Sequence, residues 1–278
     1  MNLTYFKADI GNFGDDLNLW LWPQLLGSFD EYPANLDFVG IGSILDHRIL
    51  ENKSNKKIIF GSGVRDVDFR ISNEDNVEFQ FVRGPITSRL MNDAKYITDA
   101  AYALRLLKEK PSVEKKYKYS YIPYFRNYYN FDWQLFEKIS GIHVINPTAH
   151  VETVINEINA TEHLYTSAMH GAILADIYRV PWLRVRFNKT GHESNFTSEL
   201  KWQDWLRSIN KSEIPTIDFD FNLNQKFSKI TSSIKMYTLI KKLKSTTLFT
   251  LSDDKIIAEI DEKLNDEIFL FIKNYKSK

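Results

Sequence analysis

The sequence predicts an α/β protein made of two Rossmann-like domains that face each other across a cleft, with a C-terminal helical tail. Short apolar runs alternate with segments of helical periodicity, which is typical of parallel βαβ units. A polar stretch at residues 109–116 interrupts this alternation and divides it into two halves. After Pro215 the alternation stops and a lysine-rich segment follows. We therefore expect domains at residues 1–112 and 113–214 and a helical tail at 215–278.

The first half contains apolar runs that we expect to form strands, at residues 3–8, 36–41, 57–60, 77–82 and 96–98. Segments of helical periodicity lie at residues 17–26, 86–91 and 100–108, and residues 11–16 are expected to form a loop. Pro85 suits the first helical position, where its missing N–H has no partner to lose. Glycine-bearing turns at residues 11–14, 40–42 and 61–63 follow three of these strands.

The second half repeats the pattern. Expected strands lie at residues 117–122, 142–146, 163–166 and 182–187, and expected helices at 133–140, 151–158 and 195–209. A further helix begins near His170, with Ser167 as its expected N-cap. Because ligands of doubly wound sheets bind at the carboxyl ends of the strands, the residues at those ends are the first functional candidates.

Composition narrows the classes of function. The chain has 278 residues, 43% of them hydrophobic, which suffices for one large or two modest cores. Basic and acidic residues balance at 36 each, so no overall field attracts nucleic acid. The absence of cysteine excludes disulfides, thiolate metal sites and thiol nucleophiles. We find neither a signal peptide pattern nor an apolar run near the roughly 18–20 residues of a spanning helix, and expect a cytoplasmic protein.

His170 is the most informative single residue. It lies in the first turn of its expected helix, next to Gly171. Unpaired N–H groups and the helix dipole make such a position favourable for anions. An imidazole there suits proton transfer to a phosphate or carboxylate substrate. The alternative is a histidine that only caps or packs.

The other candidates are individually weaker. The glycine turns do not match the G-x-G-x-x-G fingerprint, which argues against a dinucleotide site, and they serve equally as tight turns. Asp15 and Asp99 are either helix N-caps or functional carboxylates. The histidines lack the spacing of a zinc site, and we expect no metal. The triplets Asp66-Val-Asp68 and Asp218-Phe-Asp220 resemble metal-binding D-x-D motifs of some glycosyltransferases, but chance produces such triplets readily.

Taken together, the motifs resemble the polysaccharide pyruvyl transferase family, in its exopolysaccharide branch. They are Asn12-Phe-Gly14-Asp15-Asp-Leu-Asn18, Val39-Gly-Ile-Gly42-Ser43, Phe60-Gly-Ser-Gly63-Val-Arg65, Val82-Arg83-Gly84-Pro85, Thr98-Asp99-Ala100, Ile122-Pro123-Tyr124, Ser167-Ala-Met-His170-Gly171-Ala and Lys201-Trp202-Gln203-Asp204-Trp205. They follow one another in the family's order over residues 1–210. Tyr124 and Ala100 depart from it, since relatives often have histidine and proline there.

The resemblance implies a GT-B-like double Rossmann fold, with the acceptor on the N-terminal domain and the donor on the C-terminal domain. It also implies transfer of pyruvate from phosphoenolpyruvate to two hydroxyls of a sugar, giving a cyclic ketal and phosphate. We predict His170 and Asp15 as catalytic residues and Arg83 as the anion clamp. The other expected substrate contacts are Asn12, Gly14, Asn18, Gly42, Ser43, Gly63, Asp99, Ser167, Gly171 and Lys189.

The tail suggests a membrane partner. Residues 226–244 carry six lysines and no acid, with Phe227, Ile230, Ile234, Tyr237 and Ile240 at helical spacing. A basic amphipathic helix binds anionic lipid, which would suit a lipid-linked oligosaccharide acceptor at the inner face of the plasma membrane, or it packs on a domain. Two other functions stay open: a sugar-nucleotide-dependent glycosyltransferase of the same fold, and a non-catalytic glycan-binding protein.

Overall fold

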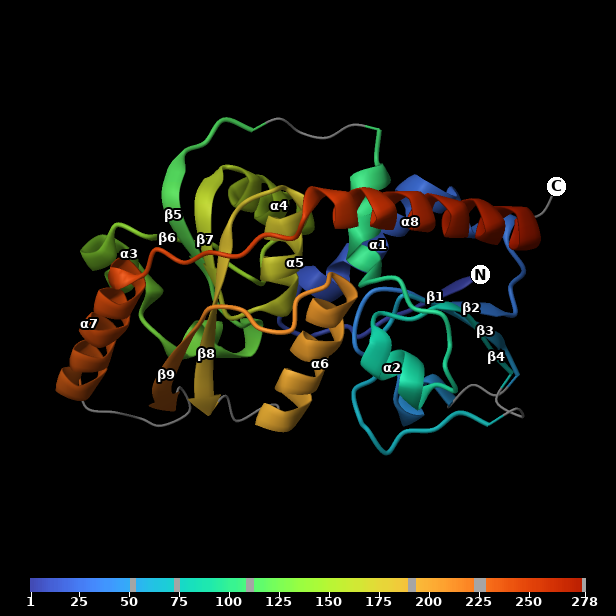
Figure 1. Ribbon diagram of the computed structural model, residues 1–278, viewed down its shortest axis with the longest axis horizontal. Coiled ribbons are helices and arrows are strands. Elements are labelled where there is room, and N and C mark those ends of the chain that lie inside the picture. Colours follow the sequence, from blue (N-terminus) through green and yellow to red (C-terminus); the bar gives the residue numbers. More distant parts are fainter. Residues whose placement is uncertain (51–53, 73–75, 109–112, 190–193, 223–228, 277–278) are drawn as a thin grey trace.

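Two parallel β-sheets lie side by side in the computed structural model, each next to its own helices (Figure 1). The structure describes residues 1–50, 54–72, 76–108, 113–189, 194–222 and 229–276. The first sheet has the order β1-β2-β3-β4 and the second the order β6-β5-β7-β8-β9. This confirms the α/β class with two parallel sheets.

The first sheet is formed by β1 (Asn2–Thr4), β2 (Leu36–Val39), β3 (Lys56–Phe60) and β4 (Val77–Phe81). The segments around them form α1 (Phe13–Leu26), the 3-10 helices η1 (Phe29–Glu31) and η2 (His47–Leu50), α2 (Pro85–Leu90) and the 3-10 helix η4 (Ala100–Leu106). Each strand pairs with its neighbour in sequence, so the Rossmann strand reversal expected here is absent from the described residues.

The second sheet contains β5 (Tyr117–Ile122), β6 (His143–Val144), β7 (Thr161–Thr166), β8 (Trp182–Lys189) and β9 (Thr216–Asn222). Between them lie the 3-10 helix η5 (Phe125–Asn130), α3 (Trp133–Ser140), α4 (Val151–Asn159), α5 (Met169–Ile177) and α6 (Asn195–Ser208). The strand order reverses at β5, which lies between β6 and β7. This is the doubly wound order in which ligands bind at the reversal point.

Four local predictions for the first half differ from the structure. The expected loop at residues 11–16 is largely helix, because Asn12 is the N-cap of α1 and its N–H donates to the Asp16 carboxylate. Asp15 therefore lies in the first helical turn and is not a cap. Strand β1 ends at Thr4, and the expected strand at residues 96–98 reduces to one bridge between Val82 and Tyr96. The helix after Asp99 is a 3-10 helix, with Asp99 as its N-cap.

The expected helical tail begins with a strand. Residues 216–222 alternate apolar and polar side chains and pair with β8 as β9. Helix α7 (Lys229–Ser245) then packs on the second sheet, and α8 (Asp254–Tyr275) returns to the first. In Figure 1 α8 runs across the half of the molecule that holds β1–β4. Its Phe271 packs against Phe38 and Phe60 of the first sheet.

One hydrophobic core extends through both halves. It joins α1, both sheets, α5 and α8, while smaller clusters lie under α7 and around η2. The boundary expected at residues 109–116 separates the two sheets along the chain, and residues 109–112 lie outside the described residues. The shared core means that the halves are packed together by more than a linker.

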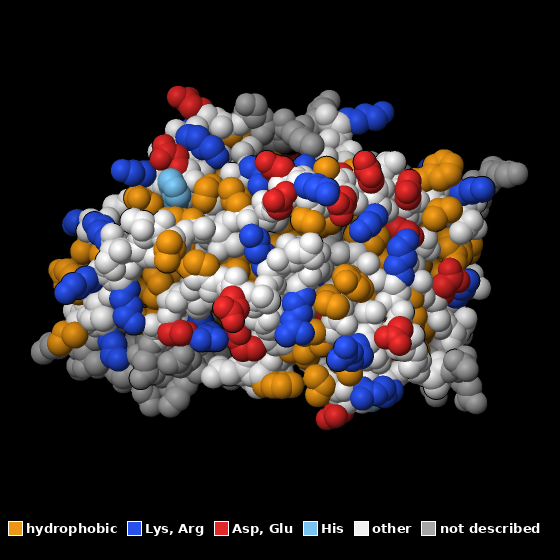
Figure 2. Space-filling view, viewed as in Figure 1, with side chains coloured by type: hydrophobic (Ala, Val, Ile, Leu, Met, Phe, Trp, Pro, Cys, Tyr) orange, Lys and Arg blue, Asp and Glu red, His pale blue; other side chains and the backbone are white. Residues whose placement is uncertain are grey.

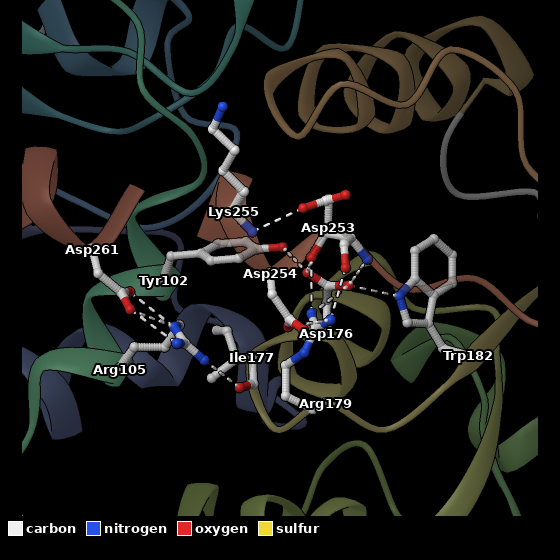
Figure 3. Close-up of polar contacts among 11 residues, drawn as sticks. Tyr102, Arg105, Asp176, Ile177, Arg179, Trp182, Asp253, Asp254, Lys255 and Asp261 are labelled. Carbon is white, nitrogen blue, oxygen red and sulfur yellow. Dashed lines mark hydrogen bonds and ion pairs between the residues drawn. The ribbon is translucent and has the colours of Figure 1, made fainter. Parts of the chain in front are cut away.

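Buried Asp176 links α5 to neighbouring segments of this core through hydrogen bonds (Figure 3). Its carboxylate accepts hydrogen bonds from Tyr102 Oη at 2.7 Å and from the Ser252 backbone N–H at 2.8 Å. Nearby, Arg105 pairs with Asp261 of α8 at 2.8 Å. Helix α5 is thus held against η4 and the segment leading into α8, which fixes the direction of its other end, where His170 lies.

Candidate active site

A pocket opens at the point where the strand order of the second sheet reverses. Segments after β5 and β7 form one wall, and residues of the first half and of α6 form the other. Its lining residues are Phe6, Asn12, Phe13, Asp15, Ser43, Ile44, Arg65, Pro123, Tyr124, Phe125, Arg126, Asn127, Trp133, Pro147, Ser167, Ala168, Met169, His170, Arg184, Val185, Arg186, Phe187, Ser198, Lys201 and Trp202. The pocket is therefore assembled from both halves of the chain, and rich in aromatic and cationic side chains.

Asp15 is the buried carboxylate of this pocket. The first turn of α1 places it there, and the Asn12 side chain donates a hydrogen bond to it. Burial raises the pKa of Asp15 from 3.8 to about 6, against the opposing effect of the positive charges of His170 and Lys201. A carboxylate with a pKa near neutrality is suited to accept a proton from a hydroxyl.

His170 lies in the first turn of α5, as expected, and faces the pocket. Its Nδ1 edge packs against the Cα of Gly14, where an added methyl group would collide with the ring. On the other edge, Nε2 lies 3.7 Å from Asp99 Oδ1. Neither Nε2 nor Asp99 Oδ2 has a hydrogen-bond partner in the described part of the chain. The imidazole thus has a buried carboxylate on one side and the pocket on the other.

Five cationic side chains line the pocket: Arg65, Arg126, Arg184, Arg186 and Lys201. Arg184 forms an ion pair with Glu199, and Arg186 forms one with Asp218. Among the described residues, Arg65 and Arg126 make no ion pair with a carboxylate, and Arg126 lies over the rings of Phe6 and Phe125 at 5.8 and 5.1 Å. These two guanidinium groups are the ones best placed to bind an anionic ligand.

Arg83 lies outside the pocket, although we predicted it as the anion clamp. Its side chain and that of Asp204 are both 0% exposed and form an ion pair at 3.0 Å. Its Nη1 donates to Ser43 Oγ at 2.5 Å, and the guanidinium lies directly against Gly63. The side chain is thus enclosed by protein and does not line the pocket, while its Nη2 atom has no hydrogen-bond partner among the described residues, and its role as an anion clamp stays a prediction.

The other predicted residues fall into three groups. Asn12, Ser43 and Ser167 line the pocket with Asp15 and His170. A second group supports the pocket from behind without lining it: Gly14, Asn18, Gly42, Gly63, Asp99 and Gly171. The backbone of Lys189 ends β8, but its side chain lies outside what the structure describes.

Two of these assignments need correction in detail. The Asn18 amide is fully used inside the protein, since it donates to the carbonyls of Asp15 and Ile41 and accepts from Ile41 N and Trp22 Nε1. Ser167 is not the N-cap of α5, which is Ala168; its hydroxyl instead shares a 2.6 Å hydrogen bond with Tyr121 Oη. Both residues shape the site through contacts that the linear pattern does not show.

Sequence reasoning missed Arg126, Asn127 and Lys201 as pocket residues. Arg126 and Asn127 follow the strand end at Pro123, so their place at a strand terminus was an available signal. Asn127 is 1% exposed, and both atoms of its amide lack a hydrogen-bond partner within the described residues. Lys201 occurs in one of the quoted motifs, but nothing in the sequence indicates that α6 reaches across to Asp15.

The described residues contain no group of three or more His, Asp or Glu side chains close enough to hold a metal ion. The D-x-D triplets are described only in part, since the side chain of Asp220 lies outside what the structure describes. Asp66 accepts a hydrogen bond from the Asp68 backbone N–H, and Asp218 pairs with Arg186. Metal-independent activity stays a prediction. In the described ranges no helix has the length and apolar character needed to cross a membrane.

Comparison with known proteins gives two matches. Residues 2–187 match the model of a family described as polysaccharide pyruvyl transferase. The chain is also 36% identical over 213 residues to the succinoglycan biosynthesis protein ExoV of Rhizobium meliloti (strain 1021). That alignment covers 75% of this chain and 65% of the relative, so the chain matches slightly less than two thirds of the relative's length.

Proposed function

The chain belongs to the polysaccharide pyruvyl transferase family, and from this premise we propose that it transfers pyruvate from phosphoenolpyruvate to two hydroxyls of a sugar in an exopolysaccharide or capsular precursor. The observation that carries the proposal is the pocket itself. It brings a buried carboxylate, an imidazole and two arginines that pair with no carboxylate of the described residues to one place. We further propose that the two halves, with the pocket between them, form a GT-B-like pair.

The reaction needs a proton donor, a base and cations. C3 of phosphoenolpyruvate gains a proton, C2 takes on oxocarbenium character, and the oxygen of the first sugar hydroxyl bonds to C2. The C2–O bond to phosphate then breaks, and the second hydroxyl closes the ketal. Of the two hydroxyl protons released, one balances the proton gained at C3 and the other leaves with the phosphate.

His170 supplies the proton to C3, and Asp15 accepts one from a sugar hydroxyl. Asp99, 3.7 Å behind the ring, orients the imidazole for the transfer. The nearby charge of His170 lowers the pKa of Asp15, which favours the ionised form that acts as the base. Arg65 and Arg126 bind the carboxylate and phosphate of the donor, because a guanidinium matches such groups with two parallel hydrogen bonds.

Asn127 binds the acceptor. A buried amide without partners costs stability, of the order of 1–3 kcal/mol, so its presence in a pocket wall indicates that a ligand completes its hydrogen bonds. Its carbonyl accepts and its NH₂ donates, which fits two neighbouring hydroxyls of a sugar. The aromatic side chains around it, including Phe125 and Trp133, provide apolar surface for the sugar ring.

Helix α7 contacts an anionic membrane surface. Its inner face, with Met236, Leu239 and Leu243, is buried on the second sheet. The outer face exposes Ile234 and Tyr237, at 60% and 57%. Basic and hydrophobic side chains gather over α7 in Figure 2, at the left of the view. The expected apolar stripe is thus divided: Ile240 is buried, and the side chains of Phe227 and Ile230 lie outside the described residues.

The deciding experiment incubates the protein with phosphoenolpyruvate and a panel of glycosides and measures phosphate release. We expect phosphate to be released only when a suitable glycoside is present. The mass of that glycoside should increase by that of one pyruvate ketal. If the protein instead releases nucleotide from sugar nucleotides and no phosphate from phosphoenolpyruvate, it is a glycosyltransferase. Binding of glycans without turnover of either donor would identify a binding protein. Pelleting with anionic but not neutral vesicles tests the membrane contact separately.

A further inference from the structure

Helix α6 follows the second sheet's strand β8 in the chain but docks on the first half of the molecule. In Figure 1 it lies between the second sheet and α2. The Asp204 carboxylate of α6 accepts hydrogen bonds from the backbone N–H groups of Ile86 and Thr87 at 2.9 and 3.0 Å. Asp204 therefore caps the first turn of α2 from another element.

The contact is close and completely buried. The Asp204 Oδ2 atom also accepts from Thr87 Oγ1 at 2.6 Å and pairs with Arg83 at 3.0 Å. A side chain at Gly84 would collide with the backbone carbonyl of Asp204, so only glycine permits this approach. Both Asp204 oxygens and two of the three Arg83 nitrogens have partners, and only Arg83 Nη2 has none among the described residues. Removing either charge would leave the other unpaired inside the protein.

The same helix forms part of the pocket wall. Lys201 lies three residues before Asp204, and neighbours at this spacing lie on adjacent positions of a helix surface. Lys201, Ser198 and Trp202 line the pocket, where Lys201 interacts electrostatically with Asp15 of α1. The position of this lysine relative to Asp15 is thus set by where α6 docks.

We propose that the Arg83–Asp204 pair is a lock that fixes α6 across the two halves, and that its purpose is to hold the Lys201 ammonium group beside Asp15. Lys201 then keeps Asp15 ionised and ready to accept a proton. The electrostatic part stands independently, and its catalytic meaning rests on the proposed function. Arg83 and Asp204 are positioning residues in this arrangement, although neither lines the pocket.

The charges around Asp15 agree with this arrangement. Burial raises its pKa, and the charges of His170 from α5 and of Lys201 from α6 lower it. Asp16, on its own helix, raises it, and Tyr5 lies near both carboxylates. Lys201 is thus one of two cations that oppose the burial of Asp15, and the one whose position depends on the lock.

The test is the titration of Asp15 itself, followed by NMR on protein with ¹³C-labelled aspartate carboxyls. The Asp15 signal is identified by its loss in Asp15→Asn. In Lys201→Met we expect the midpoint to rise by about one pH unit, as for removal of a nearby opposite charge, and in Lys201→Arg to return toward the parent value. Asp204→Asn should also raise the Asp15 midpoint, although residue 204 does not line the pocket.

Glu78→Gln is the control, because it removes an ion pair between β4 and β3, with Lys56 at 2.6 Å, and neither residue lines the pocket. It should leave the Asp15 midpoint unchanged. If Asp204→Asn does not fold, Thr87→Val, which removes only one of the hydrogen bonds to Asp204, takes its place with a smaller upward shift. An unchanged midpoint in Lys201→Met overturns the proposal, and an unchanged midpoint in the folded lock variants overturns the role of the lock.

These titrations need no substrate, so they are independent of the proposed function. Where phosphoenolpyruvate is turned over, the acidic limb of kcat/KM should move with the Asp15 midpoint in each variant. A chain that shows the shifts but does not use phosphoenolpyruvate would refute the function and keep the lock. Turnover of phosphoenolpyruvate with unshifted Asp15 midpoints would support the function and refute the lock.

Discussion

Replacing Asp15 by asparagine should make the protein more stable and much less active. The side chain is buried beside the pocket, and burial raises its pKa from 3.8 to about 6 despite the nearby charges of His170 and Lys201. In this pH interval the folded chain holds a proton that the unfolded chain has released. The free energy of unfolding therefore falls as pH rises through the interval. Asparagine has nearly the same shape and no charge, so it removes this cost.

The size of the effect follows from the shift. An increase of about two pKa units corresponds to about 3 kcal/mol, at about 1.4 kcal/mol for each unit. The full difference applies above the folded-state pKa of about 6, for example at pH 8. At about pH 4.5, where the folded carboxyl is protonated and the unfolded one is largely ionised, about 1 kcal/mol remains.

Urea unfolding followed by tryptophan fluorescence measures the difference at several pH values. The parent chain and the variant should differ most at alkaline pH and converge on acidification. A Ser198→Ala chain measured in parallel controls for the general effect of altering the pocket, because Ser198 lines it without contributing to the Asp15 shift. Two results would contradict this reasoning: a variant no more stable than its parent at pH 8, or a stability difference that does not shrink at low pH. Either would show that ionised Asp15 does not lower the free energy of unfolding of the parent.

Turnover provides the second half of the test. If Asp15 accepts a proton from the acceptor, kcat/KM of the parent should fall as pH drops through about 6, and Asp15→Asn should lose about 10²–10⁴-fold in turnover. Full activity in a stabilised Asp15→Asn chain would remove Asp15 from the proposed chemistry. Its burial would then have no functional explanation.

Four further predictions address the rest of the site. His170→Gln should lose about 10²–10⁴-fold in kcat while its melting temperature changes little, and near-normal turnover or an unfolded chain would contradict its role. Gly14→Ala should lower kcat without the gain of about 1 kcal/mol that this exchange usually brings in a helix, because the methyl group collides with His170; an active, stabilised variant would refute this contact. Asn127→Leu should raise the KM of the acceptor and leave that of phosphoenolpyruvate unchanged, with unfolding free energy higher by about 1–3 kcal/mol; equal changes in both KM values would place Asn127 elsewhere. Treatment with a chelator should leave glycoside-dependent phosphate release intact, and activity lost and restored by magnesium or manganese would show a metal requirement.

The elements that the sequence predicted best are those whose limits are set locally. Strand β5 (Tyr117–Ile122) and helix α3 (Trp133–Ser140) lie where the apolar pattern placed them. Asp132 caps α3 through its side chain, and Gly141 ends it in a left-handed conformation that glycine adopts readily. Both determinants are within a few residues of the helix that they delimit, so they can be read directly from the chain.

The sequence alone thus determined the α/β class, most strand and helix positions, the family, and the presence of Asp15 and His170 near strand ends. Only the tertiary structure decided that Arg83 is enclosed by Asp204, that Lys201 reaches Asp15, and that residues 216–222 extend the second sheet. The physical reason is the range of the interactions. Periodicity and capping act between neighbours in sequence, whereas the burial and pairing of a charge depend on segments more than a hundred residues apart, such as Arg83 and Asp204 with a separation of 121.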